Sequence, residues 1–252
     1  MQRVATLAEP PSFCLSVPTP PVSDYRPPST FASMPPVVKN LLIVNVLAFL
    51  AQLVFDTLMN PGGGVGPVMW WGALWPSGTA AVATDAPGFY PWQLVTTAFL
   101  HGGVMHLAFN MFGLYMFGAV VERSLGLQRF AGFYLACVLG SSLLQLVMVS
   151  YPFWTGAASA GAIFPTVGAS GGVLGVVTAF GMLFPRERIF IFPIPVPIEA
   201  RWLVPGFAVI SLYLGFTGRG GNVAHFAHLG GMVAGALLLL FWRYQQRAQR
   251  LA

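Results

Sequence analysis

Charged side chains are scarce in this 252-residue sequence: only 8% of the residues are Asp, Glu, Lys or Arg, against about 25% in an ordinary soluble domain. Hydrophobic residues make up 56%, and the mean hydropathy is +0.72. So few charges cannot cover the surface of a soluble fold, so the composition indicates a protein that spans a membrane several times. The net charge of +5 is then no sign of nucleic-acid binding, because the position of the cations matters more than their number.

Cysteine is almost absent as well. Cys14 lies in a proline-rich N-terminal segment and Cys137 in the middle of an apolar stretch. Because the two fall on different sides of a membrane boundary, no disulfide is predicted. The sequence also lacks an internal repeat of the kind that marks many transporters.

Apolar stretches of about 20 residues, some of them shorter, occur at six places. They are Val38–Leu58, Val104–Val121, Phe130–Tyr151, Ser170–Phe184, Trp202–Phe216 and Val223–Trp242. All six are predicted to be helices, because an open sheet edge cannot lie in lipid and the polarity does not alternate as in a β-barrel. The predicted fold class is an all-α polytopic membrane protein with six transmembrane helices.

The Lys and Arg residues predict the orientation. With the N-terminus placed in the cytoplasm, all 12 except Arg219 fall on the cytoplasmic side, so both termini are predicted to be cytoplasmic. Residues 1–36 contain nine prolines and no apolar run, which is typical of a flexible tail rather than a signal peptide. The membrane core is predicted to cover residues 37–244, and residues 245–252 form a short basic cytoplasmic tail.

The first outer loop, from about Met59 to Leu100, is rich in aromatic residues. Such a loop is expected to lie in the membrane–water interface, although an ordinary aromatic belt explains most of the pattern. The aromatic residues are Trp70, Trp71, Trp75, Tyr90 and Trp92.

Polar residues within membrane spans are costly, so each requires a partner or a function. His101 and His106 stand at the outer start of the second stretch, and His225 and His228 at the outer start of the sixth. Ser170 begins the fourth stretch from the same side, within a Gly-Ala-Ser-Gly-Gly sequence that fits the G-x-S-x-G nucleophile pattern. These groups are therefore expected to converge at one depth.

The fourth stretch is short for a membrane span. Its 15 residues make a helix of about 22 Å at about 1.5 Å per residue, and the hydrocarbon core is about 30 Å thick. Ser170 is therefore predicted to lie below the outer surface, in a depression that water can enter.

Two glycine pairs indicate that the serine and histidine helices approach closely. Gly171 and Gly175 follow Ser170, and Gly231 and Gly235 share a helix face with His228. A Ser–His hydrogen bond of about 2.6–3.2 Å needs such an approach.

We therefore predict Ser170 as a nucleophile and His228 as its general base. His225 lacks the glycine register and is expected to be a supporting or rim residue. A second role for Ser170, capping of its own helix, stays open.

None of the seven Asp and Glu residues is placed to orient a histidine near the outer surface, unless Asp56 leans inward. A dyad without a third carboxylate is therefore expected. The sequence also contains no H-E-x-x-H pattern, so neither a metal nor another cofactor is predicted.

An acyl transfer also needs donors for an oxyanion. His106 and Asn110 share a helix face at i and i+4, at about the depth of Ser170. The backbone N–H of Ser170, at a helix start, is a third donor. Asn110 also fits a second role, in joining neighbouring helices.

These motifs resemble the rhomboid intramembrane serine proteases. Their marks here are Gly168-Ala169-Ser170-Gly171, Ala227-His228 with Gly231 and Gly235, His101 with His106 and Asn110, and Gly118 with Glu122. The similarity covers about residues 37–244, with the motifs in the expected order and spacing.

The resemblance implies a six-helix rhomboid bundle in which Ser170 is the nucleophile and His228 the general base. It also implies an oxyanion hole of His106, Asn110 and the Ser170 amide, shaped by Gly168. The implied substrates are single-pass transmembrane proteins in the lipid bilayer, cut in or near the membrane segment, with Trp202–Phe216 and the following Thr217–Asn222 loop as gate and cap.

Two positions depart from the family pattern. Gln93 follows Trp92 where the family often has arginine, and Leu174 stands where some members place a tyrosine against the histidine. Apolar packing is expected to hold His228 instead.

Two other classes of function fit the sequence less well. An inactive relative that escorts membrane clients would be expected to lack the serine or the histidine, and a channel would need polar groups across the whole bilayer. The expected location is a multi-pass position in a membrane, specifically the bacterial inner membrane, and no oligomeric state is predicted.

Overall fold

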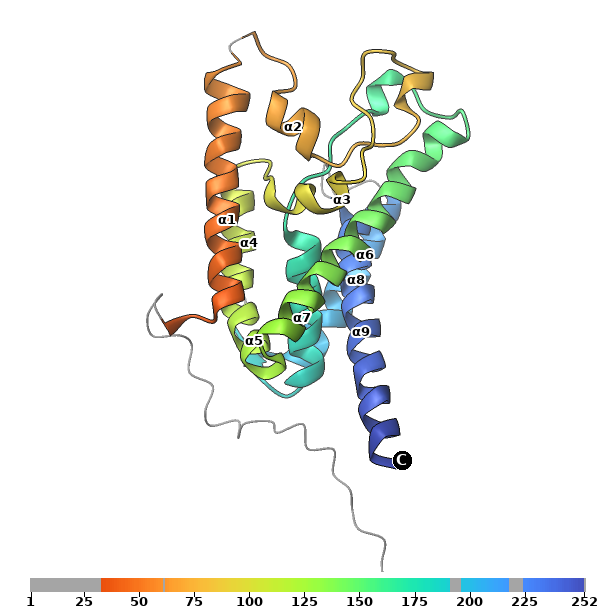
Figure 1. The fold of residues 1–252 in the computed structure, drawn as a ribbon. Coiled ribbons are helices and arrows are strands. Elements are labelled where there is room, and N and C mark those ends of the chain that lie inside the picture. Colours follow the sequence, from red (N-terminus) through yellow and green to blue (C-terminus); the bar gives the residue numbers. More distant parts are fainter. Residues whose placement is uncertain (1–32, 61, 191–195, 218–223, 252) are drawn as a thin grey trace, which may run out of the picture.

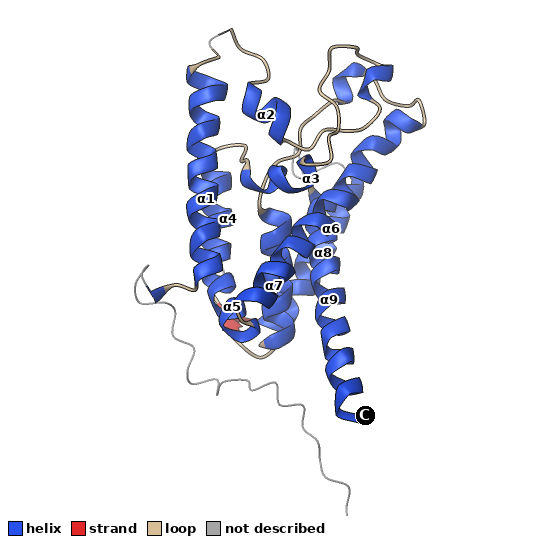
Figure 2. Cartoon of the chain, viewed as in Figure 1, coloured by secondary structure: helices blue, strands red, loops and turns tan. Residues whose placement is uncertain are grey.

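A computed structural model describes residues 33–60, 62–190, 196–217 and 224–251. Most of the predicted N-terminal tail, Arg219 and most of the predicted cap loop at 217–222 lie outside these ranges. The described chain is a bundle of helices whose connections gather at its two ends (Figures 1 and 2).

Five helical stretches are long and apolar enough to cross a membrane. They are α1 (Pro36–Gln52) with its π-helical extension η3 (Leu53–Leu58); α4 (Val104–Gly113), η6 (Leu114–Gly118) and α5 (Ala119–Leu125) in succession; α6 (Leu127–Trp154); α8 (Ala200–Thr217); and α9 (His225–Leu251). The prediction of a polytopic helical membrane protein is confirmed. α9 continues through residues 245–251, so the predicted C-terminal tail begins as a continuation of this helix.

The remaining predicted stretch, the fourth along the chain, is α7 (Ser170–Leu183), an apolar helix of only 14 residues. Ten of these residues are buried, and the helix lies between α4 on one side and α6, α8 and α9 on the other (Figure 1). Because protein surrounds α7 on these sides, it does not need the full length of a lipid-facing span. A count of six spans and the cytoplasmic position of both termini stay predictions.

Short elements fill the loops at both ends (Figure 2). The outer loop contains α2 (Pro67–Gly72), η4 (Thr79–Ala81), α3 (Gln93–Thr96) and η5 (Thr97–Phe99), and η7 (Ala160–Ala162) lies between α6 and α7. At the other end, β1 (Arg188–Ile189) and β2 (Ile198–Glu199) pair antiparallel, with Arg188 opposite Glu199.

Glycines let α7 and α9 pack backbone against backbone. A Cβ at Gly231 would overlap the carbonyl oxygen of Gly171, and a Cβ at Gly175 would lie 3.0 Å from the carbonyl oxygen of Gly231. At Gly235 a Cβ would lie 3.2 Å from the carbonyl oxygen of Gly175. The close approach predicted from the glycine pairs is confirmed, and these four residues are called the glycine seam below.

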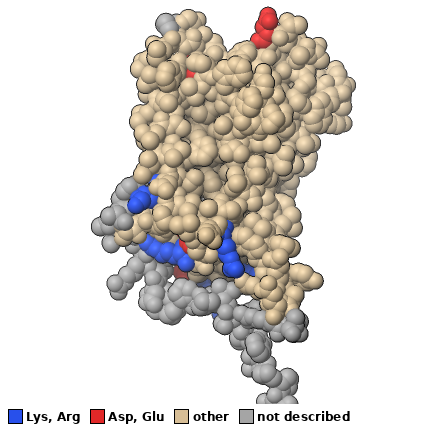
Figure 3. Space-filling model, viewed as in Figure 1, with Lys and Arg blue, Asp and Glu red and all other residues tan. Residues whose placement is uncertain are grey.

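Glu122, at the cytoplasmic end predicted for the second span, caps the first helix. Its buried carboxylate accepts hydrogen bonds from the backbone N–H groups of Val37 (2.9 Å) and Val38 (2.8 Å) in the first turn of α1. A carboxylate here satisfies free amides and interacts favourably with the helix dipole. On the face shown in Figure 3, Lys and Arg gather at this same end of the bundle, as the predicted orientation requires.

Candidate active site

The side chains of Ser170 and His228 meet although they are 58 residues apart in sequence. Ser170 is the first residue of α7, His228 lies in the first turn of α9, and the Oγ–Nε2 distance is 2.9 Å. The N-cap of α7 is Ala169, with no side-chain capping bond, so the hydroxyl of Ser170 faces the histidine instead of capping its helix. The glycine seam lies directly below this contact and permits it.

Gly168 brings the backbone before Ser170 against the ring of His106. Its φ of +131° is a conformation that favours glycine. A Cβ at this position would lie 2.8 Å from both Cε1 and Nε2 of His106, and 3.6 Å from the Oγ of Ser170. The Nε2 edge of His106 is therefore held beside the serine, with no side chain between them.

The backbone defines which nitrogen of His106 carries the proton. The N–H of Gly102 donates to Nδ1 of His106 at 3.3 Å, so Nδ1 is the acceptor. In the neutral imidazole the proton is then on Nε2. This places an N–H donor on the ring edge that faces Gly168.

Asn110 lies one turn further along α4 and is buried. Its Nδ2 donates to the carbonyl of His106 at 3.0 Å, so this bond stays within one helix. This bond does not join Asn110 to a neighbouring helix, which is the second role that the sequence suggested for Asn110. A role of Asn110 as an oxyanion donor stays a proposal.

Each histidine of the site has a second histidine edge-to-face against it. His225 lies at 6.0 Å from His228 and His101 at 5.2 Å from His106, measured between ring centroids. His225 is buried, so it supports the site from inside and does not lie at its rim. The ring of His225 thus stands beside His228, so an aromatic contact adds to the apolar packing expected from the sequence. Burial, and after it the neighbouring His106, lower the pKa of His101, which precedes α4, to about 4, so this residue is neutral at pH 7.

Asp56, the one carboxylate considered as a partner for a histidine, and Glu122 both have other partners. Asp56 accepts hydrogen bonds from Val68 and Met69 at the start of α2, at 2.7 and 3.0 Å. Glu122 caps α1 as described above. Within the described ranges, no three or more His, Cys, Asp and Glu side chains are grouped so that they could hold a metal ion.

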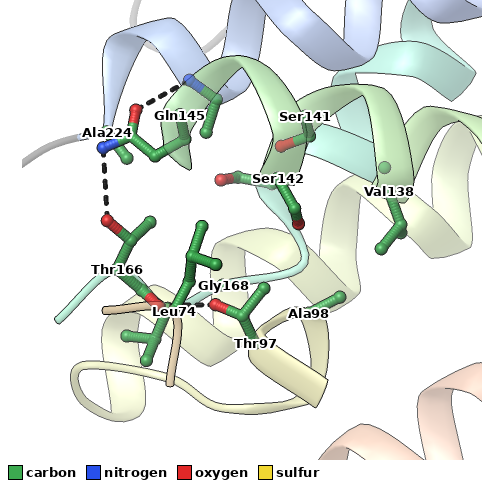
Figure 4. Close-up of a pocket in the computed structure, with 14 residues that line it drawn as sticks. Leu74, Thr97, Ala98, Val138, Ser141, Ser142, Gln145, Thr166, Gly168 and Ala224 are labelled. Carbon is green, nitrogen blue, oxygen red and sulfur yellow. Dashed lines mark hydrogen bonds between the residues drawn. The ribbon is translucent and has the colours of Figure 1, made fainter. Parts of the chain in front are cut away.

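A small polar pocket adjoins Ser170 and Gly168, and sequence inspection did not identify it (Figure 4). Its polar lining residues are Thr97, Ser141, Ser142, Gln145 and Thr166. The signal was present in α6, where Ser141, Ser142 and Gln145 interrupt an apolar span.

Gln145 connects two parts of this pocket. Its Nε2 donates to Thr166 Oγ1 at 3.2 Å, and its Oε1 accepts from the backbone N–H of Ala227 at 3.1 Å, next to His228. Gln145 thereby ties the segment before Ser170 to the start of α9.

Gln93 organises the outer loop from inside. It is fully buried; its Oε1 accepts from the N–H groups of Trp75 and Tyr90, and its Nε2 donates to the carbonyl of Gly88. Gln93 therefore serves in loop packing at the position where the family often has arginine. Trp75 is buried as well, whereas Trp92 is about half exposed, so the aromatic loop has a packed interior and an outer aromatic face.

Comparison with known proteins adds family evidence. The family model described as the Rhomboid domain matches residues 89–245. Rhomboid protein 1, mitochondrial, of Saccharomyces cerevisiae is 35% identical over 145 residues, which cover 58% of this chain and 40% of the yeast protein. RHOMBOID-like protein 12, mitochondrial, of Arabidopsis thaliana is 34% identical over 151 residues (57% of this chain, 44% of the relative).

A bacterial relative matches a stretch of similar length. Rhomboid protease GluP of Bacillus subtilis is 33% identical over 144 residues, which cover 57% of this chain and 24% of GluP. The aligned parts thus make up less than half the length of each of these three relatives. Two of the three are mitochondrial proteins, so the comparisons support a multi-pass membrane protein but not the bacterial inner membrane in particular.

Proposed function

The chain belongs to the rhomboid family, and from this premise we propose that it is an intramembrane serine endopeptidase. Its substrates would be single-pass membrane proteins, cut in or near their transmembrane segments. The observation that carries the proposal is the 2.9 Å contact between Ser170 Oγ and His228 Nε2 at the start of a short buried helix.

In the proposed mechanism, Ser170 and His228 act as a dyad. Nε2 of His228 takes the hydroxyl proton as Oγ of Ser170 attacks the carbonyl carbon of the scissile bond. Collapse of the tetrahedral intermediate breaks the C–N bond, and His228 delivers the proton to the leaving amine. Water, deprotonated by the same histidine, then hydrolyses the acyl ester and restores the serine hydroxyl.

The oxyanion would be stabilised by the donors around Gly168. The proposed donors are Nε2–H of His106, the backbone N–H of Ser170 and the amide of Asn110. Loss of one such donor costs about 100- to 1,000-fold in kcat. Gly168 is needed because a side chain there would occupy the space against His106.

Hydrolysis inside a membrane also requires water at the serine. The 14 residues of α7 span about 21 Å, against about 30 Å for the hydrocarbon core, so Ser170 would lie below the outer surface. We propose that the polar pocket beside Ser170 holds water for the second half-reaction, because its hydroxyls and the Gln145 amide supply hydrogen-bond partners. The mechanism uses no metal and no cofactor.

The test is cleavage of a transmembrane model substrate by the purified protein, together with labelling by a fluorophosphonate. Wild-type protein should cleave the substrate and become labelled, and Ser170→Ala should do neither. Full cleavage by Ser170→Ala would refute the mechanism. If the wild type neither cleaves nor labels, the chain would instead fit a client-binding relative without protease activity.

The choice of histidine is tested separately. His228→Ala should abolish cleavage, whereas His225→Ala should retain a good part of it, because only His228 contacts Ser170. Equal losses in the two variants would contradict the assignment of His228 as the base.

A further inference from the structure

The side chain of Gln52, at the end of α1, forms two hydrogen bonds with the backbone of a single residue. Its Oε1 accepts from the N–H of His101 at 3.1 Å, and its Nε2 donates to the carbonyl of His101 at 2.9 Å. The second hydrogen of Nε2 points to Sδ of Met69 at 3.5 Å. His101 is fully buried and lies outside regular secondary structure, so its backbone groups need such partners.

The carbonyl that Gln52 holds belongs to the same peptide unit as the N–H of Gly102. In a planar trans peptide the C=O and the next N–H point in opposite directions. Fixing the carbonyl of His101 therefore also fixes the direction of the Gly102 N–H. That N–H is the group that donates to Nδ1 of His106.

This bond decides what the ring of His106 can do. With Nδ1 occupied as an acceptor, Nε2 carries the proton and points at the space beside Gly168 and Ser170. If the His101–Gly102 peptide rotated, the ring could adopt the other tautomer or turn, and the donor would be lost.

We propose that Gln52 is a positioning residue that holds His106 as an oxyanion donor through the His101–Gly102 peptide. The inference rests on the proposed protease function. It also explains a polar residue in α1, a helix that buries only Val38 and Asn45, since a polar side chain within a span needs a partner or a function. The amide of Gln52 supplies, on two separate atoms, the one donor and the one acceptor that the two backbone groups of His101 require.

The main test is Gln52→Met, which keeps the length of the side chain and removes both hydrogen bonds. kcat should fall by about 10- to 100-fold, the range expected for a displaced catalytic donor, with KM unchanged. Gln52→Glu keeps an acceptor for the His101 N–H but cannot donate to the carbonyl, so it should lose nearly as much. Wild-type kcat in either folded variant would overturn the proposal.

A double-mutant cycle separates positioning from general loosening of the helix. In a His106→Ala background, Gln52→Met should cause no further loss of kcat, because the donor it positions is already gone. A further loss equal to that in the wild-type background would overturn the proposal.

Asp56→Asn is the matched control, since Asp56 also anchors this helical stretch but binds the start of α2 and not His101. It should leave kcat unchanged, and an equal fall in kcat would show general loosening and overturn the proposal. Thermal unfolding is measured for every variant to exclude misfolded protein. Absence of cleavage by the wild type would refute the protease proposal itself. An active wild type with unchanged kcat in the Gln52 variants would refute only the Gln52 proposal, so the two failures are distinguishable.

Discussion

The glycine seam allows a direct test of how the fold creates the Ser170–His228 contact. A Cβ added at Gly231 would overlap the carbonyl oxygen of Gly171 and lie 2.6 Å from its carbonyl carbon. Both are backbone atoms, so no side-chain rotation relieves the overlap. To restore an ordinary contact of 3.4 Å with both atoms, α7 and α9 would have to separate by more than about 1 Å, because the oxygen lies closer than the carbon.

Such a separation would break the dyad. The Ser170 Oγ–His228 Nε2 distance would grow from 2.9 Å to about 4 Å, beyond hydrogen-bond range. A misplacement of about 1 Å costs about 100-fold in rate, so Gly231→Ala should lower kcat by about that factor. The overpacking should also lower the free energy of unfolding by about 1–3 kcal/mol.

The assay is the initial rate of cleavage of a transmembrane substrate in proteoliposomes, with thermal unfolding recorded on the same preparation. Gly132→Ala on α6 is the control, because nothing lies within 4 Å of a Cβ at that position. It should keep wild-type activity and gain a little helix stability. Wild-type kcat in folded Gly231→Ala, or an equal loss in Gly132→Ala, would refute this account of the seam.

Three further variants test other parts of the site and its scaffold. Gly168→Ala should lower kcat at least about tenfold at unchanged KM, because its φ is +131° and a Cβ would press on His106; steady-state kinetics would contradict this if only KM changed. Glu122→Gln should lower the free energy of unfolding by about 1–2 kcal/mol by weakening the cap of α1, and an unchanged unfolding midpoint would argue against that cap. Gln93→Leu should cost about 1–3 kcal/mol, because it leaves buried backbone groups of the outer loop without partners, while fluorophosphonate labelling of the folded protein persists; loss of labelling would show that the loop shapes the site directly.

The positions of the helices and the Ser170–His228 pair could be predicted from sequence because both leave local signals. Apolar runs mark the spans, and the small-residue spacing around Ser170 and His228 marks helices that touch. The structure also places His106 beside Gly168, in line with the prediction that His106 lies at about the depth of Ser170. The shortness of α7 was also readable, since the apolar run itself is short.

Single polar residues within apolar helices could not be interpreted in this way. Gln52, Gln145 and Glu122 contact partners 49, 82 and 85 residues away. Each partner is a backbone group, which carries no sequence signature. His225 was ambiguous for the same reason: its burial depends on which neighbours pack over the start of α9.

Composition and periodicity by themselves determined that this protein is a helical membrane protein. They also determined that the helices of Ser170 and His228 approach each other, because hydrophobicity and residue size act locally along the chain. Only the tertiary structure decided how the approach is used. It places Ser170 outside the capping position and lets the Gly102 amide select the tautomer of His106. It also brings Gln52 from the first helix to hold the peptide that carries that amide. These outcomes depend on directional hydrogen bonds between distant segments, and such directions exist only after the helices have packed.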